Sequence, residues 1–160
     1  MCGDSYPRFT GGRRRSGAKP PHMSENATTV DAIRPKLQAI VEEIEDRFER
    51  TDGARDLSLS LQRKIIKHCS LSIRALHRRE FEEAENLMVK ARELLSRAEE
   101  AVRDFPEIYY SGFLQDAQKE YAEARITQSL ISGSPLPSPK EIAVDFAPYL
   151  NGLGEAVGEM

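Results

Sequence analysis

Residues 109–131 read YYSGFLQDAQKEYAEARITQSLI and predict one helix, because no Pro and no Gly after Gly112 interrupts them. Apolar, small and amide side chains recur there at three- and four-residue steps, which predicts a buried stripe: Leu114, Ala117, Tyr121, Ala124 and Gln128. Three acidic residues recur at similar steps on another face: Asp116, Glu120 and Glu123. Like charges stacked this closely cost a few tenths of a kcal/mol per pair unless a cation separates them. The face is therefore either a cation site or a solvated surface whose charge is diluted by Lys119 and Arg125.

The length and patterning of the chain favour an all-α protein built as an antiparallel helical bundle. The chain has 160 residues, which suits one domain with a substantial core. No segment alternates apolar and polar residues over the length of a strand. We expect a disordered basic tail over residues 1–28, which are rich in Gly, Pro, Ser and Arg, and a single helical domain over residues 29–160.

The charge is unevenly distributed along the chain, and the cysteines and apolar runs do not fit a disulfide-rich, zinc-binding or membrane-spanning protein. Residues 1–22 hold five Lys/Arg and one acid, which leaves 18 of the 23 basic and 25 of the 26 acidic residues in the body. The two cysteines form neither a disulfide framework nor a zinc-ligand pattern. No apolar run has the length of a membrane span, and no signal peptide opens the sequence, so we expect a cytoplasmic protein.

The segment before Gly53 predicts a first helix over residues 29–50, which that glycine would end. Its apolar residues recur with helical spacing and predict a buried stripe: Ile33, Leu37, Ile40, Val41, Ile44 and Phe48. A second helix is expected over residues 54–79. Its core face would comprise Ile65, Ile66, Cys69, Ile73 and Leu76.

The opposite face of this second helix is basic. It gathers Arg63, Lys67, Ser70, Arg74, His77 and Arg78. Clustered cations on one helix face are typical of phosphate contacts, so five of these residues are candidates for nucleic-acid binding: Arg63, Lys67, Arg74, His77 and Arg78. His77 fits a surface or capping position better than that of a catalytic base. The alternative is that the basic face pairs with an acidic third helix, expected over residues 80–104 and antiparallel to the second.

The end of the chain predicts a loop over residues 132–140 and a last helical region over residues 141–160. Pro148 marks either a break in that region or the first turn of a new helix. Gly154 and Gly158, four residues apart, predict a close approach between helices. The sequence stops inside an amphipathic helix without a C-terminal cap, so we expect it to be cut short.

Two helices thus each offer a pair of glutamates. The pairs are Glu120 with Glu123, and Glu155 with Glu159. If these helices pack side by side, four carboxylates converge without His or Cys, a ligand set that suits Mg²⁺ or Mn²⁺. Such an ion can polarise a phosphodiester and activate a bound water, which makes all four glutamates candidate metal ligands and catalytic residues.

Three stretches resemble the family of translin and translin-associated factor X, with their archaeal relatives. They are RDLSLSLQRKIIKHCSLSIRALHR (55–78), GFLQDAQKEYAEA (112–124) and YLNGLGEAVGEM (149–160). The resemblance implies an all-helical fold, an octameric homo-oligomer and binding of single-stranded RNA or DNA. It further implies Mg²⁺-dependent RNA cleavage in members of the factor-X type.

Position by position, the Glu-x-x-Glu of the catalytic members matches Glu120 and Glu123. Their Asp-x-x-x-Glu matches Glu155 and Glu159, with Glu155 in place of the Asp. The family's further C-terminal helices have no counterpart in this sequence, which puts the octamer in doubt. We expect a nucleic-acid-binding protein with an Mg²⁺-dependent endoribonuclease site, or alternatively a non-catalytic binding or scaffold subunit.

Overall fold

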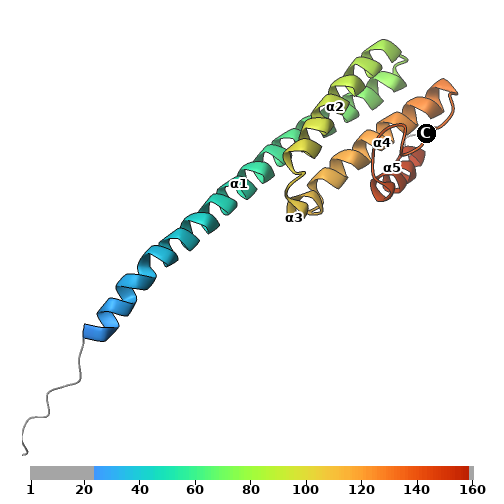
Figure 1. Ribbon diagram of the computed structural model, residues 1–160. Coiled ribbons are helices and arrows are strands. Elements are labelled where there is room, and N and C mark those ends of the chain that lie inside the picture. Colours follow the sequence, from blue (N-terminus) through green and yellow to red (C-terminus); the bar gives the residue numbers. More distant parts are fainter. Residues whose placement is uncertain (1–23, 159–160) are drawn as a thin grey trace, which may run out of the picture. The chain divides into compact units, whose positions relative to one another are not determined.

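The computed structural model describes residues 24–158, with side chains from residue 31 onward. The part of the chain that it describes contains helices and no strands, which confirms the all-α prediction (Figure 1). The helices are α1 (Ser24–His77), α2 (Phe81–Ala101), α3 (Pro106–Tyr109), α4 (Phe113–Ser132) and α5 (Phe146–Gly158). None of these helices has a stretch apolar and long enough to span a bilayer.

The first two predicted helices are one continuous helix, so the prediction that Gly53 ends a helix is wrong. Gly53 does not adopt the left-handed conformation that ends a helix at glycine. Inside a helix a glycine costs only about 1 kcal/mol relative to alanine. That cost is too small to break α1 where both flanking segments favour a helix. The helix also begins at Ser24, inside the predicted tail, whereas residues 1–23 lie outside the described residues.

The chain divides after Glu42 into two compact units. The first unit contains the beginning of α1, where the predicted buried stripe is exposed: Ile33, Leu37, Ile40 and Val41 are 42–56% exposed. In the second unit, Ile44 and Phe48 are likewise 46% and 64% exposed. Helical periodicity correctly placed these residues on one face, but it carries no information on whether another element covers that face.

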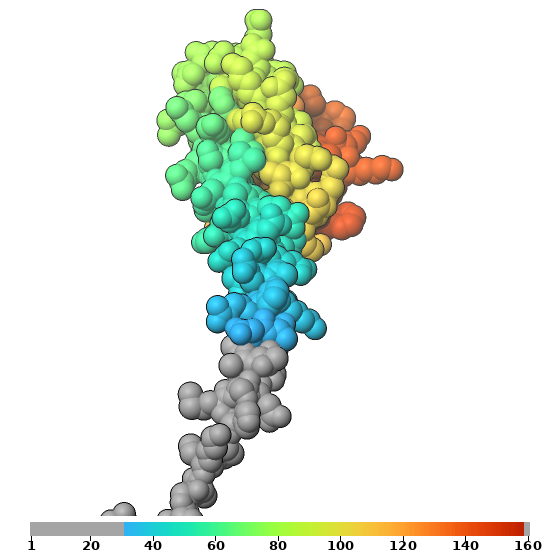
Figure 2. Space-filling view, turned by 60° about the vertical axis from the view of Figure 1, so that its left-hand side comes forward, coloured from blue at the N-terminus to red at the C-terminus, as the bar shows by residue number. Residues whose placement is uncertain are grey.

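The core of the second unit begins on the C-terminal half of α1. Four of the five predicted core residues there are buried and Ile66 is half-buried; the buried ones are Ile65, Cys69, Ile73 and Leu76. Ile65, Cys69 and Ile73 join a core with the apolar face of α2 at Met88, Ala91 and Leu95, whereas Leu76 packs in a smaller cluster with Ala75 and Ala84. The Ser72 hydroxyl donates a hydrogen bond to the carbonyl oxygen of Ala84 at 3.0 Å and ties the two helices together. Figure 2 shows this part of α1, in green, alongside α2, in yellow.

A tight turn reverses the chain between α1 and α2. The amide of Glu80 donates to the carbonyl of Ala75 and that of Arg79 to the carbonyl of Leu76, both at 2.9 Å. This pair of hydrogen bonds is the Schellman motif, which needs a residue in the left-handed conformation at the position of Arg79. Arg79 has φ 64°, a conformation that glycine adopts at lower cost.

The helix predicted over residues 109–131 begins later, at Phe113. Gly112 has φ 103°, which separates α4 from the short α3 and its leading Pro106. The predicted stripe of α4 is buried at Leu114, Ala117, Tyr121 and Ala124, and half-buried at Gln128.

Helix α5 packs closely against α4 through Gly152. An added Cβ at Gly152 would lie 2.7 Å from the carbonyl oxygen of Lys119 and 2.8 Å from the amide nitrogen of Glu123. At Gly154 and Gly158 it would meet nothing within 4 Å, so the prediction that these two glycines make the close approach is wrong. Their spacing fitted a helix contact, but Gly152 is the glycine on the side facing α4. Pro148 lies in the first turn of α5, as one of the two readings of the sequence anticipated.

Candidate functional site

Three of the four predicted glutamates converge where α5 crosses α4. Glu120 and Glu123 lie three residues apart on α4, and Glu155 reaches them from α5. One carboxylate oxygen from each lies within 4.8 Å of the other two. Glu155 follows Gly152 by nearly one turn, so the close contact at the glycine brings its carboxylate to the face of α4. The fourth predicted member, Glu159, lies outside the described residues.

The burial of the cluster is graded. Glu123 is 7% exposed, whereas the side chains of Glu120 and Glu155 are 22% and 47% exposed. A carboxylate as buried as that of Glu123 requires hydrogen bonds or a cation to offset its lost hydration. It does take part in an interaction in this structure. The cluster thus combines one inner carboxylate with two that open toward solvent.

The donor set fits a hard divalent cation. Mg²⁺ binds oxygen at about 2.0–2.1 Å, so two oxygens on opposite sides of the ion are about 4.2 Å apart. At most one pair among three ligands can lie on opposite sides, and adjacent ligands are about 2.9 Å apart. Oxygens up to 4.8 Å apart must therefore approach by up to about 2 Å, which rotation of the glutamate side chains can supply. No soft ligand belongs to this group of three carboxylates. Glu120, Glu123 and Glu155 could therefore hold Mg²⁺ or Mn²⁺.

Lys119 lies against the cluster. Its Nζ is 2.9 Å from Oε1 of Glu155 and 3.2 Å from Oε1 of Glu120. The hydrogen bond to Glu155, followed by that to Glu120, raises the pKa of Lys119. The sequence suggested that Lys119 dilutes the negative charge of the acidic face. Residues adjacent in sequence, such as Lys119 and Glu120, nevertheless point in different directions from a helix. Only the long, flexible stem of Lys119 and the position of α5 bring the ammonium between the two glutamates.

Arg125, the other diluting charge expected from the sequence, has a different role. Its Nη1 lies 2.7 Å from Oε2 of Glu85 and 3.0 Å from Oε1 of Gln128, which links α4 to α2. The hydrogen bond from Arg125 lowers the pKa of Glu85; burial opposes this shift, and a weaker hydrogen bond from Gln128 adds to it. Arg125 therefore stabilises the packing of α4 on α2.

A hollow of about 380 Å³ contains the cluster. Its lining joins the three glutamates to a segment of α1: Ser70, Ile73, Arg74, Glu120, Glu123 and Glu155. Arg74, which belongs to the predicted basic face, is exposed at the edge of this hollow. The site thus brings a guanidinium and a hydroxyl next to converging carboxylates.

The rest of the basic face divides into two groups. Arg63, Lys67 and Arg74 are exposed and form no ion pair within residues 31–158. Arg78 instead binds Glu80, with its Nε 2.8 Å from the carboxylate. His77 is exposed in the last turn of α1. The alternative interpretation, in which the basic face pairs with acidic residues, therefore applies to Arg78. The charged groups of Arg63, Lys67 and Arg74 face solvent instead.

Cys69 lies in the core beneath the site and was predicted only as a core residue. It is fully buried, and this burial raises the pKa of its thiol, with further contributions from the nearby Glu120 and Glu123. A thiol held neutral in this way is a poor nucleophile and a poor metal ligand. Cys69 therefore acts as packing under the carboxylates.

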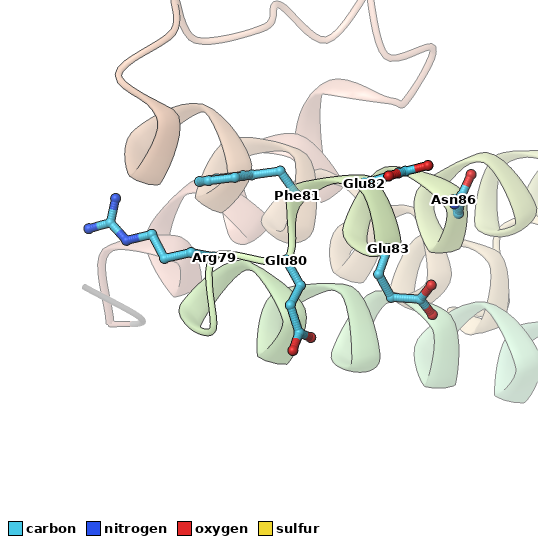
Figure 3. A pocket seen from close by; sticks show the side chains of 6 residues that line it. All are labelled: Arg79, Glu80, Phe81, Glu82, Glu83 and Asn86. Carbon is cyan, nitrogen blue, oxygen red and sulfur yellow. The ribbon is translucent and has the colours of Figure 1, made fainter.

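A larger hollow, of about 610 Å³, lies at the turn between α1 and α2 (Figure 3). It is lined by Arg79, Glu80, Phe81, Glu82, Glu83 and Asn86. Figure 3 shows the carboxylates of Glu80 and Glu83 pointing to the same side of the turn. Glu82 and Glu83 occupy the first turn of α2, where the helix dipole favours acidic residues. These acids therefore have a local structural role, and we assign no site to this hollow.

Comparisons with known proteins bear on the fold. No family model matches the chain. An uncharacterised protein of Methanocaldococcus jannaschii is 28% identical over 114 residues, which cover 68% of this chain and 49% of that protein. The crystal structure of apo-NeC3PO superimposes with a TM-score of 0.69 and 20% identity, over 74% of this chain and 63% of that one.

The fold is translin-like. This confirms the fold implied by the three motifs, and at 20% identity the likeness concerns the fold alone. The chain spans about half the length of the curated relative that it matches and under two thirds of the solved structure.

Proposed function

We propose that this protein binds single-stranded nucleic acid, preferably RNA, along the basic face of α1 and cleaves it with Mg²⁺ or Mn²⁺. The ion would be held by Glu120, Glu123 and Glu155. One observation carries the proposal: a single hollow contains three converging carboxylates and Arg74. A surface that served only to bind phosphates would gain nothing from acidic groups at that point, because they repel the backbone.

The residues of the hollow supply the two functions that phosphodiester cleavage needs, which are metal binding and contacts to phosphate. A bound divalent ion would polarise the phosphodiester and lower the pKa of a coordinated water. Arg74 is placed to donate hydrogen bonds to phosphate oxygens, and the hydroxyl of Ser70 is available for the same purpose. Arg63 and Lys67 lie on the same exposed face, about three and two turns before Arg74 along α1, where they would bind neighbouring phosphates.

Replacement of the inner carboxylate tests the proposal. Glu123→Gln keeps the shape of the side chain and removes the charge, so it should abolish Mg²⁺-dependent cleavage of a labelled single-stranded RNA while retaining binding. Glu93→Gln, which removes a charge from an exposed position on α2, is the matched control and should cleave like the wild type. EDTA should stop cleavage by the wild type. Equal cleavage by Glu123→Gln and the wild type would refute the catalytic role.

A second candidate function is a binding subunit without chemistry, and the position of Lys119 favours it. An ammonium between Glu120 and Glu155 already neutralises part of the cluster. This alternative predicts salt-sensitive RNA binding and no products with either ion. A homo-oligomeric assembly, expected from the family resemblance, stays a prediction that light scattering tests.

A further inference from the structure

The ammonium of Lys119 lies where a bound cation would contact the outer two glutamates. Its Nζ contacts one oxygen of Glu155 and one of Glu120, from the same helix that supplies Glu120 and Glu123. The side chain of Lys119 is 23% exposed and borders the cluster rather than sealing it. Its stem of four methylenes can therefore move the charge away from the carboxylates without a change in the backbone.

The distances show that an ammonium and a metal ion require different spacings of the same oxygens. Lys119 holds the two carboxylate oxygens at 2.9 and 3.2 Å from its nitrogen. A magnesium ion at the same point would hold them at about 2.0–2.1 Å, roughly 1 Å closer. The separations of up to 4.8 Å among the three glutamates exceed the roughly 4.2 Å that one magnesium ion allows, and Lys119 contacts two of these three carboxylates.

Charge gives a second reason why the two cations exclude each other. Three carboxylates carry a charge of −3, which Lys119 reduces to −2. A divalent ion between the same oxygens would lie within a few ångströms of the ammonium and repel it. Because two cations this close repel each other, one of them has to move out of direct contact with the carboxylate oxygens.

We propose that Lys119 is a built-in competitor of the metal ion, which occupies the cation position in the ion-free protein and is displaced when the ion binds. This inference rests on the proposed metal site and deepens it, because it makes one side chain the determinant of affinity for the ion. The close helix contact at Gly152 holds Glu155 near α4 independently of Lys119. Removal of the ammonium therefore leaves the carboxylates in place.

The test measures binding of Mn²⁺ alone, by electron paramagnetic resonance and isothermal titration calorimetry, on the full chain. Lys119→Met keeps the length of the side chain and removes its charge, and it should tighten Mn²⁺ binding at least tenfold. That is about the effect of one unit charge roughly 5 Å from a divalent ion, even with the screening of bulk water. Lys119→Arg keeps the charge and should bind like the wild type.

Two further variants serve as controls. Lys90→Met removes the same charge from an exposed position on α2 and should leave the affinity unchanged. Glu123→Gln combined with Lys119→Met should lose the gain, which places the ion at the cluster. Circular dichroism checks that each variant is folded.

The outcomes separate this inference from the proposed function. Suppose that the wild type binds Mn²⁺, that Glu123→Gln does not, and that the affinity of Lys119→Met equals or falls below that of the wild type. Lys119 is then not a competitor of the ion, while the metal site stands. If neither the wild type nor Lys119→Met binds Mn²⁺ in a manner that depends on Glu123, both the inference and the proposed metal site are wrong.

Discussion

The close contact between α5 and α4 gives the sharpest test of how this fold builds its candidate site. Gly152→Ala would place a methyl group 2.7 Å from one backbone atom of α4 and 2.8 Å from another. Ordinary contacts begin at about 3.4 Å, so α5 must move away from α4 and carry Glu155 with it. Gly154→Ala, two residues further along the same helix, adds the same methyl group in open space.

The pair of variants isolates the energy of that contact. Both replace glycine by alanine within α5, and each gains about 1 kcal/mol of helix propensity. Only Gly152→Ala also incurs the cost of overpacking, about 1–3 kcal/mol. The free energy of unfolding of Gly152→Ala should therefore lie about 1–3 kcal/mol below that of Gly154→Ala, because the propensity term cancels between them.

Urea unfolding followed by circular dichroism measures this difference, and Mn²⁺ titration of the same samples measures the site. Gly152→Ala should bind the ion more weakly than Gly154→Ala, because displacement of α5 draws Glu155 away from Glu120 and Glu123. Equal midpoints for the two variants would refute the close approach at Gly152. Unequal stability with equal ion binding would show that Glu155 does not contribute to the site.

Two further predictions concern stability. Arg79→Gly should raise the free energy of unfolding by about 1 kcal/mol in urea titrations, because φ 64° is strained for arginine and open to glycine; a lower midpoint would contradict the role of the turn. Glu85→Gln should lower stability at pH 7 by less than about 1 kcal/mol, since the half-exposed carboxylate pairs with Arg125. Because that pairing lowers the pKa of Glu85 in the folded state, its contribution is present above the unfolded value of about 4.3 and is lost as the pH falls through the folded value. The difference between Glu85→Gln and wild type should therefore shrink between pH 5 and pH 3, and a constant difference would count against the ion pair.

Several features of the site followed from local spacing alone. The three-residue step from Glu120 to Glu123 places two carboxylates on one face of any helix, and the structure keeps them there. The same periodicity identified the buried side of α4 and the core face of α1 at Ile65 and Cys69. These predictions depend on backbone geometry within a few turns, which the sequence encodes directly.

Other features depended on contacts between distant residues. Neither Ile33 nor Phe48 reveals from its spacing whether a neighbour covers it, and both are exposed. The choice of Gly152 over Gly154 as the contact residue depends on how α5 is rotated against α4, which no local pattern encodes.

The sequence by itself thus determined an all-helical protein, the faces of its helices and the acidic and basic character of two of them. Only the tertiary structure decided that Glu155 reaches the α4 pair, that Arg74 shares their hollow and that Lys119 lies between two of the carboxylates. The reason is physical: helix formation and amphipathicity arise from interactions within a few residues. A site made by two helices depends instead on how closely their backbones approach, and here the missing side chain of one glycine sets that distance.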